Sequence, residues 1–425
     1  MTDRPDRGLP SLQAEPWLAD PRLQAVFDAL TAEGGEARVA GGAVRNALLA
    51  MPVSDIDIAT TEPPDRVMAL AEKAGLTPHP TGLGHGTVTV AAGPEDARLP
   101  VEVTTLRVDV KTYGRHAEVA FTADWAEDAA RRDFTMNALY CDRAGGVHDP
   151  LGGYPDLAAR RVRFVGDPVL RIREDYLRIL RFFRMHAIYG RDGLDREGLD
   201  ACAAERAGLD SLSAERVRAE VLRLLAAPGA LAVVDATIAR GILNHVVPAP
   251  HDRETFAALV AIEAAVSDGS DPLRRLFALS PGDRAHVARL GERLRLSNAE
   301  AARLARLAAA GPVSPALRES ERKSVLYRLG LETYRDAVLL AWARSGAGPG
   351  EESWCALHAL GERWQPPRFP VSGADILARG VPPGPEVGRL LAALEDWWVA
   401  TGFPDDKEAV LARLDRFGIR REGGG

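Results

Sequence analysis

The residues best suited to chemistry are two aspartates, Asp55 and Asp57, which stand two residues apart in the run DIDIAT. The run is strand-like, and side chains alternate between the two faces of a strand. Both carboxylates are therefore expected on one face, with Ile56 and Ile58 on the other. Carboxylates held side by side repel each other unless a cation joins them, and hard oxygen ligands near phosphate suit Mg²⁺. The pair thus predicts a magnesium site.

A glycine pair precedes the aspartates. Gly41 and Gly42 stand between a short apolar strand signal and AVRNALLA, a good helix-forming run. Glycines at such a point let the backbone turn sharply and approach a ligand closely. The helix that follows would direct unpaired N–H groups at an anion, and Arg45 in its first turn would add a positive charge. A phosphate site beside a metal pair indicates metal-assisted nucleotidyl transfer.

Each pattern alone has an ordinary interpretation, as a turn or as the edge of a surface strand. The ordered combination of GGxVR, a helix and DxD on an apolar strand is more specific, and it resembles the superfamily of tRNA nucleotidyltransferases and bacterial poly(A) polymerases. This resemblance implies that Gly42 and Arg45 contact the nucleoside triphosphate and that Asp55 and Asp57 carry magnesium. The family usually has Asp where this chain has Asn46, which removes a carboxylate but leaves the metal ligands intact.

A second motif is RRDFTMNAL at residues 131–139. An isolated RRD favours a structural salt bridge. The longer run matches a family motif, and the resemblance implies that Arg132 holds the triphosphate. Glu102, in the strand-like run LPVEVTTL, is either a third carboxylate beside the aspartate pair or a solvent-facing strand residue, and the second interpretation carries more weight.

The stretch 169–189 predicts one amphipathic helix. Asp175 and Arg178 are three residues apart in it, a spacing that favours an intrahelical salt bridge. The family resemblance implies instead that this pair is the amino-acid template for the incoming base, and that Arg181 and Arg184 also bind nucleotide. Because steps of three drift around a helix, we expect only the first two side chains to read one base edge. The two later arginines would serve phosphates, RNA or packing.

A polar segment with a central glycine runs from Arg107 to Phe121. Such a loop is either an exposed connection or a mobile active-site element. The resemblance favours the second, because nucleotidyltransferases that add both C and A carry a flexible loop here. The residues expected to act in it are Arg107, Asp109 and Arg115.

Composition excludes several classes of protein. No run approaches eighteen apolar residues, and the start MTDRPDRGLP lacks the apolar core of a signal peptide, so we expect no membrane partner and a cytoplasmic location. Cys141, Cys202 and Cys355 are far apart, which indicates neither disulfides nor a thiolate metal site.

The net charge of −7 argues weakly against nucleic-acid binding, but the average hides a local reversal. The segment from Arg160 to Arg184 contains eight arginines and three acidic residues, which gives it a net charge of +5. This segment is either a binding surface for RNA or triphosphate, or a solvated helix face.

The chain of 425 residues is too long for one core. The resemblance implies an α+β fold, with a polymerase-β-like nucleotidyltransferase head whose sheet is mixed or antiparallel, followed by an all-α neck, body and tail. No strand pattern is convincing after the head. We expect the head at 1–153, a helical neck with the template helix at 154–230, and a tRNA-binding body and tail at 231–425.

The function that the resemblance implies is addition of CMP and AMP, from CTP and ATP, to the tRNA 3′ end without a nucleic-acid template, with Mg²⁺ as cofactor and pyrophosphate as product. A sibling activity is poly(A) polymerase, which usually has a basic cluster where this chain has the neutral GLGHGTVTV. Partial CC-only or A-only addition is a second alternative, and the charged loop argues against the CC-only form. A catalytically inactive RNA-binding protein is a third, which the intact Asp55, Asp57 and Arg132 oppose.

Overall fold

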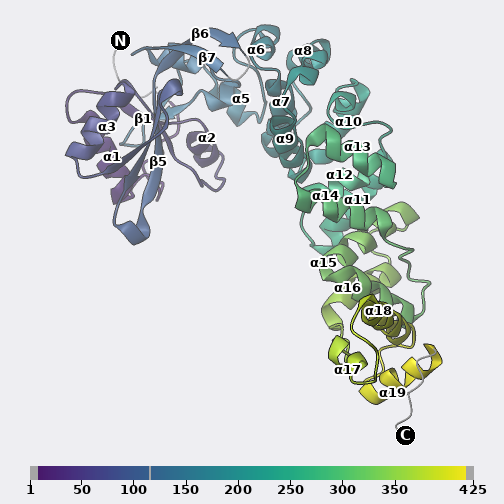
Figure 1. Cartoon of the computed structure of the whole chain (residues 1–425). Coiled ribbons are helices and arrows are strands. Elements are labelled where there is room, and N and C mark those ends of the chain that lie inside the picture. The colour runs from purple at the N-terminus through teal and green to yellow at the C-terminus, as the bar shows by residue number, and fades with distance from the viewer. Residues whose placement is uncertain (1–7, 114–115, 418–425) are drawn as a thin grey trace. The chain divides into compact units, whose positions relative to one another are not determined.

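The computed structural model describes residues 8–113 and 116–417, and its side-chain description leaves out 109–118 and 415–417 (Figure 1). The chain forms two compact units, the first ending at Val246 and the second beginning at Val247. The boundaries expected at residues 153 and 230 both fall within the first unit. The finer division into head, neck and body therefore stays a prediction.

The first unit is built on a mixed sheet. Within the described residues the sheet has seven strands in the order β3-β4-β5-β2-β1-β8-β9, and β2 and β5 run parallel while the other neighbours pair antiparallel. Val88, Val90, Val101 and Val103 are buried, as expected for alternating β-branched residues on one covered face. The strands are β1 (Ala37–Ala40), β2 (Asp57–Thr60), β3 (Thr77–Gly82), β4 (Thr87–Ala92), β5 (Leu99–Thr105), β8 (Tyr140–Cys141) and β9 (Val147–His148).

Helices α1 (Pro21–Thr31) and α3 (Pro64–Lys73) pack against each other and against β4 and β5. Asp20 caps α1 by accepting the N–H of Arg22 at 2.8 Å, and proline occupies the first turn, where its missing N–H is harmless. Leu23, Phe27 and Leu30 lie on one helical face and are buried. This packing covers the strands that support Asp57.

The segment expected as a polar loop is mainly a β-hairpin. Strands β6 (Arg107–Tyr113) and β7 (His116–Phe121) form a separate two-stranded antiparallel sheet, so the expectation of a loop over the whole segment was wrong. The alternating pattern of RVDVKTY and HAEVAF accounts for the pairing. Arg107 lies on β6, the side chain of Asp109 is not described, and Arg115 lies outside the described residues.

Two helices, α6 (Pro168–Glu174) and α7 (Leu177–Tyr189), replace the single helix predicted for 169–189. The prediction of one helix was wrong at Asp175, whose backbone is extended with φ −154° and ψ 104°. The Asp175 carboxylate accepts the N–H of Leu177 at 3.1 Å, and this local side-chain bond competes with helix continuation. Beyond the break, Phe182 packs against Phe134 and Phe164.

The rest of the first unit after β9 is helical, apart from turns and one isolated bridge between Phe134 and Phe164, within the part of the chain that the structure describes. Helix α9 packs against α7. The remaining helices of the unit are α2 (Gly42–Leu48), α4 (Trp125–Ala130), α5 (Tyr154–Ala158), α8 (Arg196–Ala204), α9 (Ala214–Ala226) and α10 (Ala230–Ala239).

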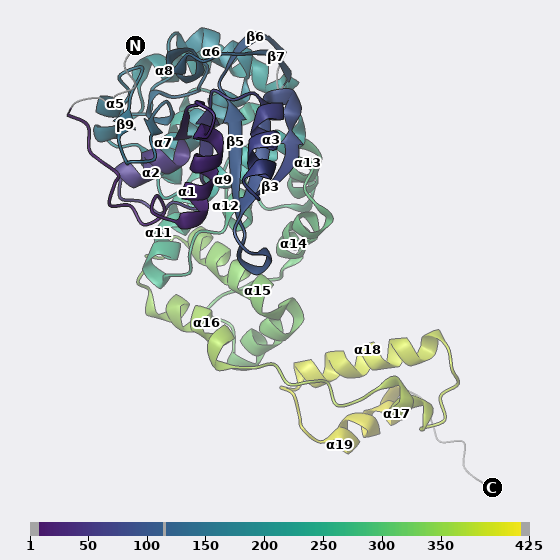
Figure 2. The same ribbon diagram turned by 90° about the vertical axis from the view of Figure 1, so that its left-hand side faces the viewer.

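In the second unit the described residues form helices joined by turns and loops, with no strand among them, which confirms the α+β class with helices following the sheet. One apolar core surrounds Tyr334 and Trp342, and a second surrounds Trp398 of α18. Helix α18 packs against α17 and α19 (Figure 2). In the described parts of the chain no helix combines the length and the apolar character that crossing a membrane requires. The helices are α11 (Arg253–Val266), α12 (Pro272–Ala278), α13 (Arg284–Leu294), α14 (Asn298–Ala309), α15 (Glu319–Ser345), α16 (Glu352–Arg363), α17 (Gly373–Leu377), α18 (Pro385–Ala400) and α19 (Lys407–Leu411).

Candidate active site

One polar cavity of about 710 Å³ in the first unit gathers most of the predicted site residues. Arginines outnumber aspartates eight to four among its lining residues, so the cavity suits a polyanion that arrives with a cation. The predicted residues that line it are Gly42, Arg45, Asp55, Asp57, Arg132, Asp175, Arg178, Arg181 and Arg184. Arg107 is not among the lining residues.

The two central carboxylates enter the cavity from one short segment. Asp57 is the first residue of β2, whereas Asp55 precedes the strand and accepts a hydrogen bond from the Ser54 hydroxyl at 2.9 Å. The expectation that both lie within the strand was therefore wrong for Asp55, although both reach the same cavity. Desolvation of the carboxylate, Glu102 and Asp55 raise the pKa of Asp57, and Arg132 opposes them. Such an excess of negative charge favours a bound cation.

The turn before α2 depends on Gly41. This residue has φ 67° and ψ −115°, a conformation that side-chain-bearing residues rarely adopt. A Cβ at Gly41 would also lie 3.0 Å from Nη1 of Arg132. The glycine pair thus allows the backbone to lie close to an arginine of the cavity, and Gly41 carries the conformational requirement.

Arg45 is buried among neutral hydrogen-bond partners. Its guanidinium donates to Oδ1 of Asn137 at 2.5 Å, to Oδ1 of Asn46 at 2.9 Å and to the hydroxyl of Tyr189 at 2.7 Å. Burial lowers the pKa of Arg45, and Tyr189 and Asp133 oppose that effect. Asn46 therefore orients Arg45 without neutralising it, while its own amide donates to the Pro52 carbonyl at 2.8 Å.

Arg132 both forms a structural salt bridge and lines the cavity, so the two interpretations of its motif hold together. It donates to Oδ2 of Asp128 at 3.1 Å and to the hydroxyl of Tyr140 at 3.2 Å, and it also lines the cavity. Burial disfavours ionisation of Asp128, but Arg132 and Arg131 outweigh it and hold the pKa of Asp128 below its usual range. The ion pair with Asp128 fixes the orientation of Arg132, so the side chain loses less conformational entropy when a ligand binds.

Asp175 and Arg178 both line the cavity but do not pair with each other's side chains. Arg178 donates to the Glu174 carboxylate and, at 2.8 Å, to the Arg171 carbonyl. Asp175 accepts from Nη2 of Arg216 at 2.6 Å. The default expectation of an intrahelical Asp175–Arg178 salt bridge was wrong, because the chain bends at Asp175.

The two later arginines of α7 belong to the same cavity and have acidic partners. Arg181 is 2.5 Å from Oδ2 of Asp133, and Arg184 is 2.6 Å from Oε2 of Glu220. Burial disfavours ionisation of Asp133, yet Arg181 and the Asn137 amide keep its pKa below the usual range. These ion pairs hold two positive groups at the cavity wall.

Sequence reasoning missed Arg216, which lines the cavity and pairs with Asp175 from 41 residues away. Arg216 stands in the first turn of α9, in the run SLSAERVRAEVLRLL, whose resemblance to a family motif implies that it braces the template helix, but the residue itself was not singled out. Glu102 is the Cα partner of Asp57 in the parallel pair, is exposed, and is not among the cavity-lining residues.

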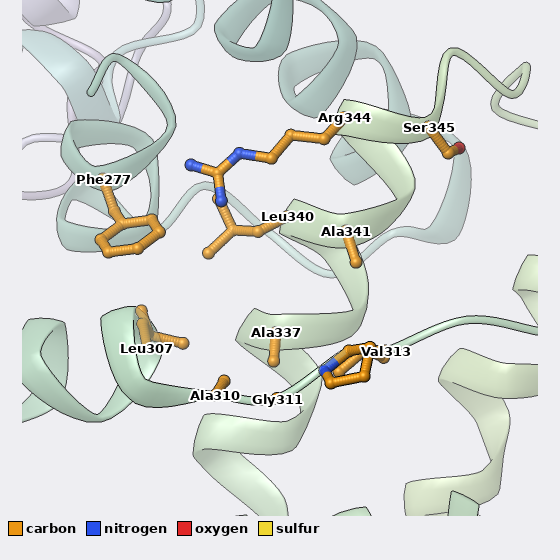
Figure 3. A pocket seen from close by; sticks show the side chains of 11 residues that line it. Phe277, Leu307, Ala310, Gly311, Val313, Ala337, Leu340, Ala341, Arg344 and Ser345 are labelled. Atoms are coloured by element: carbon orange, nitrogen blue, oxygen red, sulfur yellow. The ribbon is translucent and has the colours of Figure 1, made fainter. Parts of the chain in front are cut away.

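A second cavity, of about 350 Å³, lies in the second unit and has a different chemistry (Figure 3). Its wall is mainly apolar, with Phe277, Leu307 and Leu340, and Arg344 is the one ionisable side chain among its described lining residues. The Arg344 guanidinium lies 5.2 Å from the centroid of the Phe277 ring. The described lining of this cavity offers no carboxylate for a metal.

Comparison with known proteins agrees with this geometry. Residues 37–163 match the family described as the poly(A) polymerase head domain. This range holds the sheet, both aspartates, the glycine turn and Arg132. The fold and the cavity thus define a nucleotidyltransferase with a head of that type.

Full-length relatives narrow the class. The mitochondrial CCA tRNA nucleotidyltransferase 1 of Mus musculus is 34% identical over 408 residues, covering 93% of this chain and 90% of the relative. The CCA-adding enzyme of Streptococcus gordonii is 30% identical over 407 residues, covering 92% and 95%. A crystal structure of the Bacillus stearothermophilus CCA-adding enzyme in complex with CTP superposes with a TM-score of 0.73 at 25% identity, covering 94% of this chain and 97% of the other. The chain belongs to the family of CCA-adding tRNA nucleotidyltransferases.

Proposed function

We propose that this chain adds CMP and then AMP to the 3′ end of tRNA, using CTP and ATP and releasing pyrophosphate without a nucleic-acid template. The main support is a single arginine-rich cavity lined by Asp55 and Asp57 and also by Asp175 and Arg178. One group of residues suits phosphoryl chemistry and the other suits recognition of a base edge. Full-length similarity to CCA-adding enzymes supports the substrate and the product.

The metal that fits Asp55 and Asp57 is Mg²⁺. Within the described residues no set of three or more His, Cys, Asp or Glu side chains is arranged to hold a metal ion. Mg²⁺ is commonly bound by one or two carboxylates together with substrate phosphates, so the aspartate pair and a triphosphate form a suitable ligand set. Mg²⁺ held by Asp55 and Asp57 would neutralise charge on the phosphates and would favour ionisation of the attacking hydroxyl.

The arginines hold the triphosphate in this proposal. Arg45 is the best-suited side chain, because its charge is buried and the side chains that accept its hydrogen bonds are neutral. Arg132 adds a second fixed guanidinium, and Gly41 and Gly42 allow the backbone to approach. With the triphosphate fixed, the tRNA 3′ hydroxyl attacks the α-phosphorus in line and pyrophosphate leaves, so no side-chain nucleophile is needed.

Asp175 and Arg178 select the base. Cytosine and adenine present an amino donor beside a ring-nitrogen acceptor, whereas uracil and guanine present a carbonyl acceptor beside a ring N–H donor. A carboxylate only accepts hydrogen bonds and a guanidinium only donates them, so this pair matches cytosine and adenine and mismatches the other two. Arg181 and Arg184 lie along the same wall and would contact phosphate or RNA.

The hairpin of β6 and β7 adjusts the pocket between the C and A steps. Its first strand follows β5 directly, and the Arg107 N–H donates to Oδ1 of Asp128, the carboxylate that also holds Arg132. In the described residues the hairpin pairs only with itself, and isolated two-stranded ribbons are marginally stable. The element is thus suited to ordering on the correct complex.

We also propose a cytoplasmic location. Relatives from Mus musculus, Danio rerio and Homo sapiens are named as mitochondrial proteins, so a fusion to a fluorescent protein followed by fractionation is the direct test. Recovery of the fusion in an organelle fraction would contradict this proposal.

The experiment that tests the function uses the purified full-length chain, CTP, ATP, Mg²⁺ and a tRNA transcript that ends at the discriminator base. Sequencing the product 3′ ends should give CCA. Runs of A would support the poly(A) polymerase alternative, while ends stopping at CC, or A added only to a tRNA that already ends in CC, would support partial activity. Unextended ends on every transcript would contradict all of these transfer activities.

A further inference from the structure

The cavity of about 350 Å³ in the second unit combines an apolar wall with one cationic side chain among its described lining residues. Phe277 of α12, Leu307 of α14 and Leu340 of α15 contribute the largest apolar side chains of this wall. Arg344 of α15 extends across the cavity toward Phe277 (Figure 3). Ligand sites commonly have this composition, an apolar concave surface with a few polar groups that fix the orientation of the ligand.

Arg344 has no acidic partner within the described residues. Its guanidinium lies 5.2 Å from the centroid of the Phe277 ring, and Nη2 donates a long hydrogen bond of 3.4 Å to the Ser280 carbonyl. Desolvation lowers the pKa of Arg344, and the charge of Asp252 only partly opposes that effect. The positive charge is thus incompletely compensated, and an anion placed beside it would be stabilised.

The backbone at Gly282 leaves room for this guanidinium. A Cβ at that position would lie 2.5 Å from Nη2 of Arg344, closer than Cβ atoms approach, and the φ of Gly282 is +78°. Arg344 as a whole residue is nevertheless exposed to solvent. The guanidinium therefore lies between Phe277 and Gly282 at the edge of the cavity, where a dissolved ligand can reach it.

A polar cavity of about 480 Å³ in the same unit shows the contrast. Its lining residue Arg274 is 2.8 Å from Oε1 of Glu263, and Arg303 is 2.7 Å from Oδ2 of Asp336. These ion pairs join α12 to α11 and α14 to α15, which accounts for both arginines as structural. Within the described residues Arg344 links no two helices through a carboxylate, so a structural ion pair does not explain its place.

We propose that the cavity beside Arg344 binds a small monocarboxylate with an apolar body, such as a short-chain or aromatic acid. The Arg344 guanidinium donates to the two carboxylate oxygens, and the apolar body lies against Leu307, Leu340 and Phe277. A cavity near the lower end of the range of about 300–1,000 Å³ for ligand sites suits a small molecule. A phosphate ester or an RNA backbone fits less well, because the described lining supplies one cation and an otherwise mainly apolar surface.

The first test titrates the full-length chain with hexanoate at constant ionic strength, by calorimetry and by thermal unfolding. Hexanoate should bind saturably and raise the unfolding temperature, because a ligand that binds only the folded state stabilises it. Acetate lacks the apolar body and 1-hexanol lacks the charge, so each should bind at least about tenfold more weakly. Inorganic phosphate is the probe for the alternative occupant.

The second test separates the charged part of the site from the apolar part. Arg344→Met keeps a long side chain without the charge and should weaken hexanoate binding by at least about tenfold, the loss expected for a charge-assisted hydrogen bond. Ala341→Leu should weaken it as well, because the larger side chain occupies space in the cavity. Arg328→Met is the matched control, since Arg328 also lies on α15, pairs with Asp396 at 3.0 Å and does not line the cavity.

Saturable hexanoate binding that is lost in Arg344→Met and in Ala341→Leu but kept in Arg328→Met would support the inference. No saturable binding to the wild-type chain, equal affinity for acetate and hexanoate, or unchanged affinity in Arg344→Met would overturn it. Tighter binding of phosphate than of hexanoate would also overturn it. If Arg344→Met does not fold, Ala341→Leu and the comparison of hexanoate with 1-hexanol decide by the same criteria.

Discussion

Asp57, the first residue of β2, lies opposite Glu102 of β5 in the parallel strand pair of the sheet. Desolvation and the charges of Glu102 and Asp55 raise the pKa of Asp57, although Arg132 opposes the shift. The carboxylates at this end of the sheet thus oppose one another in the absence of a cation. The repulsion between these carboxylates lowers the stability of the metal-free fold at the position where a metal would bind.

Asp57→Asn should therefore make the metal-free protein more stable at neutral pH. The pKa of Asp57 is higher in the folded state than its unfolded value of 3.8, so ionisation of Asp57 disfavours the folded state. The stability that protonated Asp57 contributes is fully present below pH 3.8 and is lost as the pH rises through the folded pKa. Thermal unfolding in EDTA should show a gap in favour of Asn at neutral pH, and the gap should narrow as the pH falls through the folded pKa of Asp57 toward 3.8. A less stable variant at pH 7 would contradict this electrostatic account.

Gly41→Ala should reduce both stability and activity. A side chain at its positive φ costs about 1–2 kcal/mol, and the new Cβ would press on Nη1 of Arg132. Gly75→Ala is the control, because Gly75 has φ +74° but open space around the position of a Cβ. Thermal unfolding should show destabilisation in both variants, while kcat/KM for CTP should fall only in Gly41→Ala. Equal kinetics in the two folded variants would argue against a tight turn beside the triphosphate.

Asp175→Ala should weaken rejection of UTP and GTP. The lost match between acceptor and amino group is worth about 1–3 kcal/mol, or roughly fivefold to 150-fold in selectivity. Competition among the four nucleotides measures the effect. Unchanged selectivity would refute the template role of Asp175.

Replacing residues 109–115 by a short Gly-Ser link should spare the two C additions and suppress the final A. A passive connection would instead affect all steps alike. Sequencing of the tRNA 3′ ends should show accumulation at CC, because the pocket cannot be adjusted for adenine. Completion to CCA at the normal rate would contradict the proposal that the hairpin adjusts the pocket for adenine.

The fold class followed from the family resemblance that the local motifs carry, and most of the predicted site residues lie in one cavity. GGxVR, the aspartate pair and RRDFTMNAL each lie within a short segment, so their spacing carries the information. The alternating pattern of β6 and β7 was also present, but the charged residues led to the interpretation as a loop.

The remaining features depend on contacts that periodicity does not encode. The helix break arises because the Asp175 side chain captures the Leu177 N–H, a local competition that the helical pattern conceals. Arg216 was missed because its partner is 41 residues away. The neutral partners of Arg45, including Tyr189, likewise come together only in the folded chain.

The central claim is that Asp55 and Asp57 carry the transfer reaction. The most direct measurement is single-turnover addition of C to tRNA by the wild-type chain, Asp55→Asn and Asp57→Asn, at saturating CTP and Mg²⁺. The account predicts that each variant is folded, as judged by circular dichroism, but slower by at least about a thousandfold, because losing an anionic metal ligand weakens the transition state far more than the fold. Turnover near the wild-type rate in either folded variant would contradict it.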